Sequence, residues 1–144
     1  MRGALLLIVG LLVSSAAQAL EYRSLTDNAI VYDAGSRQAK PLFILLKGTP
    51  VEVIVSLEGW IKVREQGGGL GWVERSQLGA QRQLIVTASG ADARLTASDA
   101  APVVFSASKD VVLELLEPPA NGWVRVRHRD GQIGFVPLKS VWGL

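Results

Sequence analysis

An internal repeat constrains this chain more than any other feature of its sequence. Residues 59–65 read GWIKVRE, and residues 122–128 read GWVRVRH, 63 positions further along. At the same offset, GWV at 71–73 matches GFV at 134–136. Self-similarity at a fixed offset indicates two copies of one structural unit. Each copy has about 55–60 residues, a size at which a small domain becomes marginally able to fold alone.

Within each copy the apolar residues recur with a period of two. In the run 123–127, Val124 and Val126 point one way, while Trp123 and Arg125 point the other. Such alternation, enriched in β-branched residues, is typical of half-buried strands. No segment after residue 20 holds a convincing helical period. The sequence therefore predicts an all-β protein of two tandem small barrels, each with about five short strands.

Local patterns give three further expectations about the strands and turns. In VEVIVSL (51–57), the alternation places Val51, Val53, Val55 and Leu57 on one face. Asp130-Gly131, between two alternating runs, indicates a β-hairpin. The short runs ERSQL and PLKSV, one near the end of each copy, are each expected to form a single 3₁₀ turn.

His128-Arg129-Asp130 has the residues of a protein-kinase catalytic loop, but its surroundings exclude that role. A kinase also needs a glycine-rich phosphate loop, a strand lysine and a metal-binding aspartate in a far larger chain. The chain has one histidine and no cysteine, which leaves little for a catalytic triad or for metals that prefer thiolate and imidazole ligands. No catalytic residue, metal or cofactor is expected.

The first residues have the pattern of an export signal. One arginine precedes an apolar run, and Ala17 and Ala19 form an A-x-A cleavage motif. The apolar core is short for a membrane span, although an uncleaved anchor is the alternative. We expect a signal peptide over 1–19 that is cleaved after Ala19, no span in the mature chain, and units over 20–80 and 81–144. The expected location is the periplasm or cell envelope.

Composition narrows the partner classes. The chain has 15 Lys and Arg against 13 Asp and Glu, with no basic run or stripe, so nucleic acid is not an expected partner. Without cysteine, each exported unit must be held together by its own core. No feature of the sequence indicates an oligomeric state.

The stretch NGWVRVRHRDGQIGFVPLKSV (121–141) resembles SH3 domains, and the bacterial SH3-like (SH3b) group in particular. In SH3 domains a Gly-Trp opens a strand, an Asp/Asn-Gly hairpin follows, and Gly-aromatic-aliphatic-Pro leads into a 3₁₀ turn and a final strand. Residues 84–105 and, more divergently, 22–48 look like the opening of the bacterial form. The resemblance implies a non-catalytic recognition module. Bacterial members are similar to cell-wall-targeting domains that bind wall peptides.

The resemblance also implies where a binding groove would lie. The groove tryptophan corresponds to Trp123 in the second copy and to Trp60 in the first. The groove proline corresponds to Pro137, but the first copy has Glu74 there. The groove tyrosine is missing from both copies. Binding of proline-rich peptides, the property of eukaryotic SH3 domains, is therefore not expected.

Aromatic and cationic side chains supply the candidate ligand contacts. A tryptophan beside cations suits stacking on a peptide or sugar and pairing with carboxylates, although each tryptophan could instead fold over a barrel end. The aromatic residues of GWV and GFV, Trp72 and Phe135, could instead pack at the core or rim of the barrel. Tyr32 and Arg94, near the first long loop of each copy, could equally form structural hydrogen bonds with the neighbouring loop. The candidates are Tyr32, Trp60, Trp72, Arg94, Trp123, Arg125, Phe135 and Pro137.

Two classes of function fit these patterns. The first is an adaptor that binds a cell-wall peptide or a periplasmic protein in shallow aromatic grooves. The second is a structural accessory subunit of an envelope complex with no small ligand. The short link near 79–83 predicts limited interdomain motion. The run 84–86 could pair back onto the first copy, and Trp142 is expected to anchor the C-terminus in its barrel.

Overall fold

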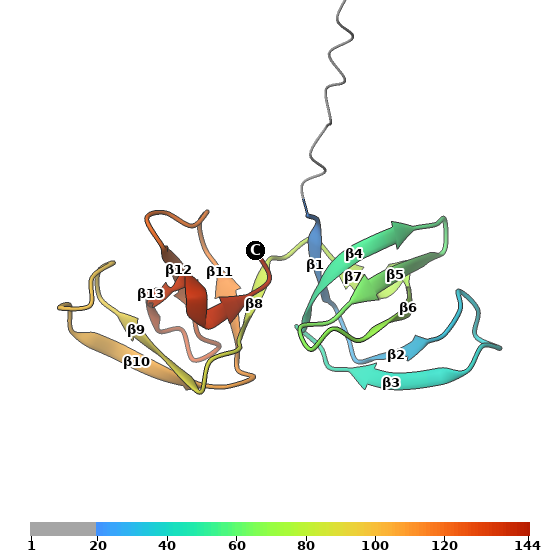
Figure 1. Cartoon of the computed structure of the whole chain (residues 1–144), viewed down its shortest axis with the longest axis horizontal. Helices are drawn as coiled ribbons and strands as arrows, with labels where there is room; N and C mark the ends of the chain where they lie inside the picture. The colour runs from blue at the N-terminus through green and yellow to red at the C-terminus, as the bar shows by residue number, and fades with distance from the viewer. Residues whose placement is uncertain (1–19) are drawn as a thin grey trace, which may run out of the picture.

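The computed structural model describes residues 20–144 and shows two small all-β units side by side (Figure 1). The predicted cleavage motif at Ala17 and Ala19 lies outside these residues. Each unit is one seven-stranded antiparallel sheet, with order β3-β2-β6-β5-β4-β1-β7 in the first and β10-β9-β13-β12-β11-β8-β14 in the second. The second order is the first with every number raised by seven. The tandem fold predicted from the repeat is confirmed.

The two units have matching elements. The first comprises β1 (Tyr22–Leu25), β2 (Ala29–Tyr32), β3 (Pro41–Leu45), β4 (Pro50–Ser56), β5 (Trp60–Arg64), β6 (Leu70–Glu74), the 3₁₀ helix η1 (Arg75–Gln77) and β7 (Leu78–Gly79). The second comprises β8 (Gln83–Val86), β9 (Gly90–Arg94), β10 (Val103–Ser108), β11 (Val112–Leu115), β12 (Trp123–Arg127), β13 (Ile133–Pro137), η2 (Leu138–Ser140) and β14 (Val141–Trp142). Both 3₁₀ turns are where the sequence predicted them.

Each unit has seven strands rather than about five, for two reasons. The first long segment of each copy is not a plain loop, because its ends pair as a hairpin, β2 with β3 and β9 with β10. A two-residue strand after the 3₁₀ turn also pairs with the first strand of its unit. Within residues 20–144, no helix is long and apolar enough to cross a membrane.

Each unit has its own hydrophobic core, built from the alternating strands. Ile61 and Val63 of β5 are at most 1 % exposed, and Val124 and Val126 of β12 are fully buried. The neighbours of opposite parity, such as Trp60 and Trp123, are only half-buried. The alternation predicted for these strands is confirmed.

The prediction for residues 51–57 is wrong in its second half. Val51 is fully buried, but Val55 is 39 % and Leu57 is 51 % exposed. The pairing of β4 with β5 passes from Val53↔Val63 directly to Val55↔Lys62, so Ile54 is an extra residue in the ladder. A β-bulge of this kind reverses the inside–outside parity of everything that follows it.

The link between the units is short, and the strand after it stays in its own unit. β7 ends at Gly79 and β8 begins at Gln83. β8 lies between β11 and β14, with Leu84 opposite Leu113 and both fully buried. The expected pairing of 84–86 with the first copy is therefore wrong, because the second core needs this strand.

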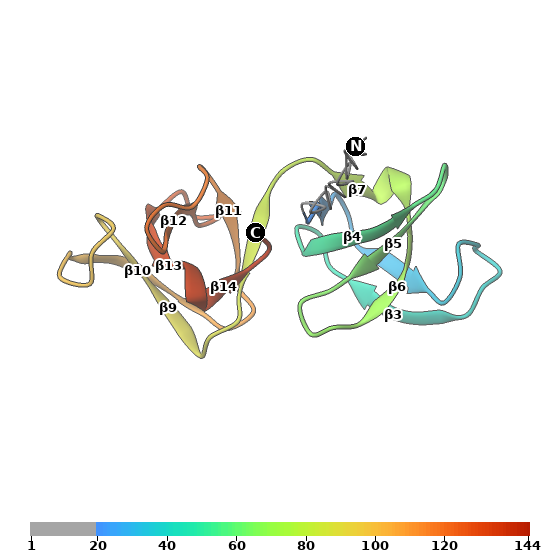
Figure 2. The ribbon, with the colours of Figure 1, turned by 45° about the horizontal axis from the view of Figure 1, so that its top comes forward.

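An aromatic contact joins the two units. Trp142 pairs through its backbone with Ile85 of its own unit, but its ring packs edge-on against Tyr22 of the first unit, with centroids 5.3 Å apart. The Arg82 guanidinium lies 5.6 Å from the centre of the Tyr22 ring and donates a hydrogen bond to the Gly143 carbonyl (2.8 Å). We call Tyr22, Arg82 and Trp142 the junction cluster. Figures 1 and 2 both place the C-terminus between the units.

Trp142 therefore does more than anchor the C-terminus in its own barrel, because the junction cluster brings the two units into direct contact. The first unit also holds the linker, since the Ser24 hydroxyl donates to the Gln81 carbonyl (2.7 Å). A Cβ placed on Gly143 would lie 3.4 Å from Pro50 of the first unit, so the backbones approach closely here.

The junction cluster leads to a prediction about alkaline pH. Burial raises the pKa of the Tyr22 phenol, Glu52 raises it further, and Arg82 opposes the shift. The folded chain thus holds this proton more tightly than the unfolded chain. The contribution to stability is complete below pH 10 and is lost as the pH rises through the raised pKa. Absorbance titration at 295 nm should show one late phenol, which Tyr22→Phe removes. A late phenol that persists in Tyr22→Phe would contradict the assignment.

Candidate functional site

A groove in the second unit brings two predicted site residues together. Trp123 opens β12, Pro137 closes β13, and the two are directly paired across the ladder. Both are half-buried and line a groove of about 500 Å³. An indole and a proline ring side by side form a rigid apolar platform on which a peptide backbone or a sugar face can stack. The remaining lining residues are Asp99, Gly122, Leu138 and Lys139.

Sequence reasoning missed these four lining residues. Leu138 and Lys139 follow Pro137 directly, and Gly122 precedes Trp123. Their position next to the two predicted residues in the sequence could have identified them as groove residues. Asp99 had no signal, because it comes from the loop between β9 and β10. Asp99 and Lys139 are both exposed, so the groove has an anionic and a cationic side chain among its walls.

The matching position in the first unit differs in chemistry. Trp60 pairs with Glu74 rather than with a proline, and Glu74 forms an ion pair with Arg37 (2.7 Å). The Tyr32 ring packs edge-on against Trp60, with centroids 5.7 Å apart. Gly35 packs on the same tryptophan, since a Cβ there would lie 3.2 Å from Trp60. Trp60 thus contacts two residues of its own unit, Tyr32 at the end of β2 and Gly35 in the segment between β2 and β3.

Trp72, Phe135 and Arg94 lie on the strands that flank these tryptophans. Trp72 is paired with Tyr32, and Phe135 with Arg94, so Arg94 occupies the place that Tyr32 has in the first unit. Arg94 donates to the Ala101 carbonyl (2.8 Å) and so holds the loop that also carries Asp99. The structure therefore groups Tyr32, Trp60 and Trp72 in one unit, and Arg94 and Phe135 in the other.

Arg125 and His128 lie away from the groove. The Arg125 guanidinium is 3.2 Å from the Glu117 carboxylate at the surface. His128 follows the end of β12, and its Nδ1 accepts a hydrogen bond from the Asp130 backbone N–H (3.1 Å). Gly131 then adopts a φ of 91°, as the predicted Asp-Gly turn requires. Across residues 20–144, no cluster of three or more His, Cys, Asp or Glu side chains is placed to hold a metal ion.

Comparison with known families matches both units. The bacterial SH3 domain family matches residues 26–79 and again residues 88–143. The chain belongs to the bacterial SH3 domain family. The resemblance found in residues 121–141 is confirmed, and so is its occurrence as a tandem pair. No curated protein matches the sequence.

Three solved structures are similar to this SH3 pair. NlpC1 from Trichomonas vaginalis has 18% identity and a TM-score of 0.40, over 89% of this chain and 47% of its own. NlpC2 from the same organism has 16% identity and a TM-score of 0.40, over 87% and 48%. An NlpC/P60 family protein from Bacillus cereus has 16% identity and a TM-score of 0.38, over 85% and 56%. The SH3 pair spans about half the length of these proteins.

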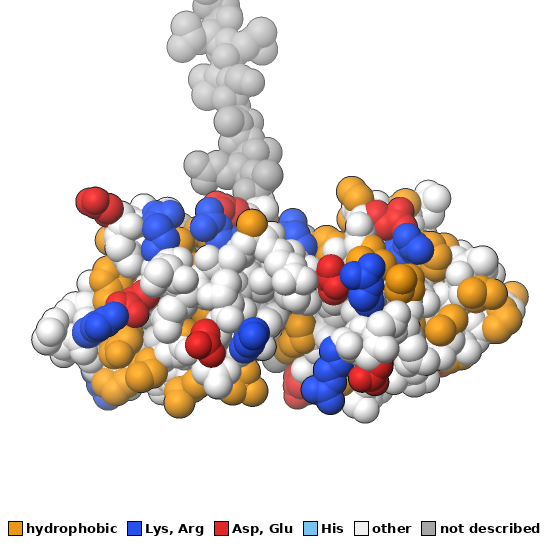
Figure 3. All heavy atoms as spheres, turned by 180° about the vertical axis from the view of Figure 1, so that it is seen from behind, with side chains coloured by type: hydrophobic (Ala, Val, Ile, Leu, Met, Phe, Trp, Pro, Cys, Tyr) orange, Lys and Arg blue, Asp and Glu red, His pale blue; other side chains and the backbone are white. Residues whose placement is uncertain are grey.

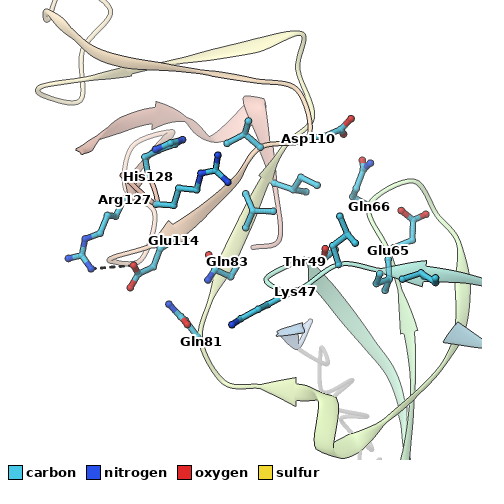
Figure 4. Close-up of a pocket in the computed structure, with 17 residues that line it drawn as sticks. Lys47, Thr49, Glu65, Gln66, Gln81, Gln83, Asp110, Glu114, Arg127 and His128 are labelled. Carbon is cyan, nitrogen blue, oxygen red and sulfur yellow. Dashed lines mark hydrogen bonds and ion pairs between the residues drawn. The ribbon is translucent and has the colours of Figure 1, made fainter. Parts of the chain in front are cut away.

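A larger hollow lies between the two SH3 units. It measures about 940 Å³, and both units and the linker contribute to its walls. The close-up in Figure 4 shows Lys47, Thr49, Glu65 and Gln66 on one side, facing Glu114, Arg127 and His128 on the other. No single unit carries this hollow, and sequence reasoning did not identify it, because it depends on the relative placement of the SH3 units.

The first SH3 unit also has an exposed apolar face. On the hairpin β2–β3, Ile30 is paired with Ile44, and Ile44 and Leu46 are 65 % and 64 % exposed. The paired positions in the second unit are Asp92 and Ser106, joined by a hydrogen bond of 2.6 Å. Seen from behind, hydrophobic side chains gather along the lower edge of the first unit (Figure 3). The fold does not require apolar residues at these positions, since the second unit has the same strands with Asp92 and Ser106 there.

Proposed function

We propose that this protein is an exported, non-catalytic recognition module that binds the peptide part of the bacterial cell wall through the Trp123 groove. The observation that carries the proposal is the pairing of half-buried Trp123 with Pro137 in an open groove. Binding sites of this kind combine an apolar platform with a few polar groups that fix the orientation of the ligand.

The polar side chains of the groove suit a wall peptide. Such a peptide carries carboxylates and amines together with small apolar side chains. Lys139 would pair with a carboxylate and Asp99 with an amine, while Trp123 and Pro137 would contact the apolar part. Because Asp99 and Lys139 are exposed, these charges contribute more to orientation than to affinity.

The second unit is the better candidate for binding than the first. In the first unit, Trp60 is in contact with Tyr32, and the neighbouring Glu74 is paired with Arg37. A ligand there would have to compete with contacts that the chain already makes with itself. Export is part of the proposal, and it rests on the Ala17–Ala19 motif of the first residues.

Co-sedimentation with purified peptidoglycan sacculi tests the proposal. Residues 20–144 should sediment with sacculi, and Trp123→Ala should reduce the bound fraction at least tenfold, because it removes the stacking platform. Trp60→Ala is the matched control at the equivalent position and should keep most of the binding. Circular dichroism should show that both variants are folded. Failure of the parent protein to sediment would contradict wall recognition.

The exposed apolar face favours a second candidate function, that of a subunit held in an envelope complex. An exposed apolar face is typical of a protein–protein contact. The variant Ile30→Asp copies Asp92 of the second unit and should leave folding intact, and Ile30 does not line the hollow between the units. If the protein acts mainly through the exposed apolar face, this variant should lose its protein partner while sacculus binding is unchanged. If the groove has the main function, the Trp123 variant alone should show a defect.

A further inference from the structure

The hollow between the two units is built from equivalent parts of both copies. In the first unit its wall includes the turn between β3 and β4, with Lys47, and the tip of the β5–β6 hairpin, with Glu65 and Gln66. In the second unit it includes the turn between β10 and β11, with Asp110, and the tip that follows β12. The two copies therefore turn corresponding ends toward each other, although their charges differ.

Contacts at the junction connect the two walls of the hollow. The junction cluster joins the units through the edge-on contact of Tyr22 with Trp142 and through Arg82. Two lining residues flank Arg82, Gln81 on the linker and Gln83 at the start of β8. A hollow with walls held in this way loses less entropy when a ligand binds than one between freely moving domains.

Charged groups at the two ends of the hollow have no partner of their own among the described residues. Lys47 and Asp110 form no ion pair within residues 20–144, and both are exposed. In the view of Figure 4, Asp110 and Gln66 lie at one end, and Lys47 and Gln81 at the other. Asp110 also has a φ of 70°, a conformation that disfavours most side chains and that the first copy fills with Gly48.

Between these ends, part of each wall is apolar. Ile44 and Leu46 line the side of the first unit, and Ile85 and Val112 line the side of the second. The two residues of the first unit are more than 60 % exposed, so they are available to a ligand. The hollow thus offers a cation at one end, an anion at the other and apolar side chains between them. Charged side chains lie beside the apolar ones, and glutamine amides can hydrogen-bond peptide groups. The charged side chains are Glu65, Glu114, Arg127 and Arg129.

We propose that this hollow binds a short peptide with small aliphatic side chains, its carboxylate at Lys47 and its ammonium at Asp110. A free amino acid would not satisfy both ends, because its two charged groups are attached to one carbon atom. The volume of about 940 Å³ lies within the range of pockets that take drug-sized ligands, which suits a peptide of a few residues. The inference rests on the proposed peptide recognition and adds a site separate from the Trp123 groove.

Titration of residues 20–144 with trialanine, followed by NMR, tests the inference. Trialanine should shift the signals of Lys47, Asp110 and Val112. N-acetylated and C-amidated trialanine should each bind about tenfold more weakly, since each removes one charge-assisted contact. Lys47→Gln and Asp110→Asn should each weaken trialanine about tenfold, while Lys109→Gln, an exposed neighbour outside the hollow, should have no effect. Asparagine is chosen because it tolerates the backbone conformation of Asp110.

The outcomes separate this site from the groove. Trialanine binding that survives in Trp123→Ala and falls in Lys47→Gln supports a peptide site in the hollow. Binding that falls in Trp123→Ala and is unchanged in Lys47→Gln would overturn the hollow and leave the groove as the peptide site. The absence of trialanine binding at millimolar concentration would overturn the inference, even if the parent protein sediments with sacculi.

Discussion

Gly71→Ala is expected to destabilise the first unit by about 3 kcal/mol, the upper end for an added methyl group in a packed core. Gly71 is buried in β6, where this strand passes close to β2. A Cβ at this position would lie 2.9 Å from the Tyr32 carbonyl oxygen and would overlap a Val31 methyl group. The Tyr32 backbone is fixed by its pairing with β3, so the contact cannot be relieved by a change of side-chain rotamer.

The loss is large relative to the stability of so small a unit. At roughly 0.05–0.15 kcal/mol per residue, a 60-residue domain has about 3–9 kcal/mol in total. Chemical denaturation should therefore show an early transition for the first unit in Gly71→Ala. Gly59→Ala is the matched control, because a Cβ there meets nothing within 4 Å. Equal denaturation midpoints for Gly71→Ala and Gly59→Ala would contradict the close approach of β6 to β2.

Trp142→Ala is expected to uncouple the two units. The substitution removes the edge-on contact with Tyr22, and the loss of an aromatic pair together with its burial costs about 2 kcal/mol at the junction. The contacts that remain are the Arg82 guanidinium over the Tyr22 ring and a few hydrogen bonds, such as that between Ser24 and the Gln81 carbonyl. The short linker alone does not fix an orientation, so the relative placement of the units should broaden.

Backbone ¹⁵N relaxation measures this coupling directly. In the parent protein both units should report one overall rotational correlation time, and in Trp142→Ala each should report a shorter one. Tyr22→Phe is the control, since it keeps the ring that Trp142 contacts. Separate correlation times in the parent protein would contradict a fixed junction and, with it, the hollow between the units.

The sequence predicted the fold well where neighbouring side chains alternate without interruption. The positions of Ile61, Val63, Val124 and Val126 followed from alternation alone, and all four are buried. Alternation failed at Ile54, because nothing in the run VEVIVSL distinguishes a bulge from a regular strand. A bulge depends on the partner strand, which a local pattern does not contain.

The candidate site was predicted only in part, for a related reason. Trp123 and Pro137 followed from the family resemblance and meet in one groove. Asp99 reaches the same groove from a loop far along the chain, and no local signal marked it. The junction contact of Trp142 with Tyr22 joins residues from opposite ends of the described chain. Contacts between two units depend on how the units dock. Neither the internal repeat nor the alternation of apolar residues contains this information.

The most direct test of wall recognition is the response of the tryptophan indole N–H signals to soluble wall peptides. The four tryptophans give separate probes of the groove, of its counterpart in the first unit, and of the junction. We predict that the Trp123 signal shifts in proportion to bound ligand, while the Trp60 signal does not move. A shift at Trp60 with none at Trp123 would contradict the assignment of the groove, and no shift at either would contradict recognition of wall peptides through the groove.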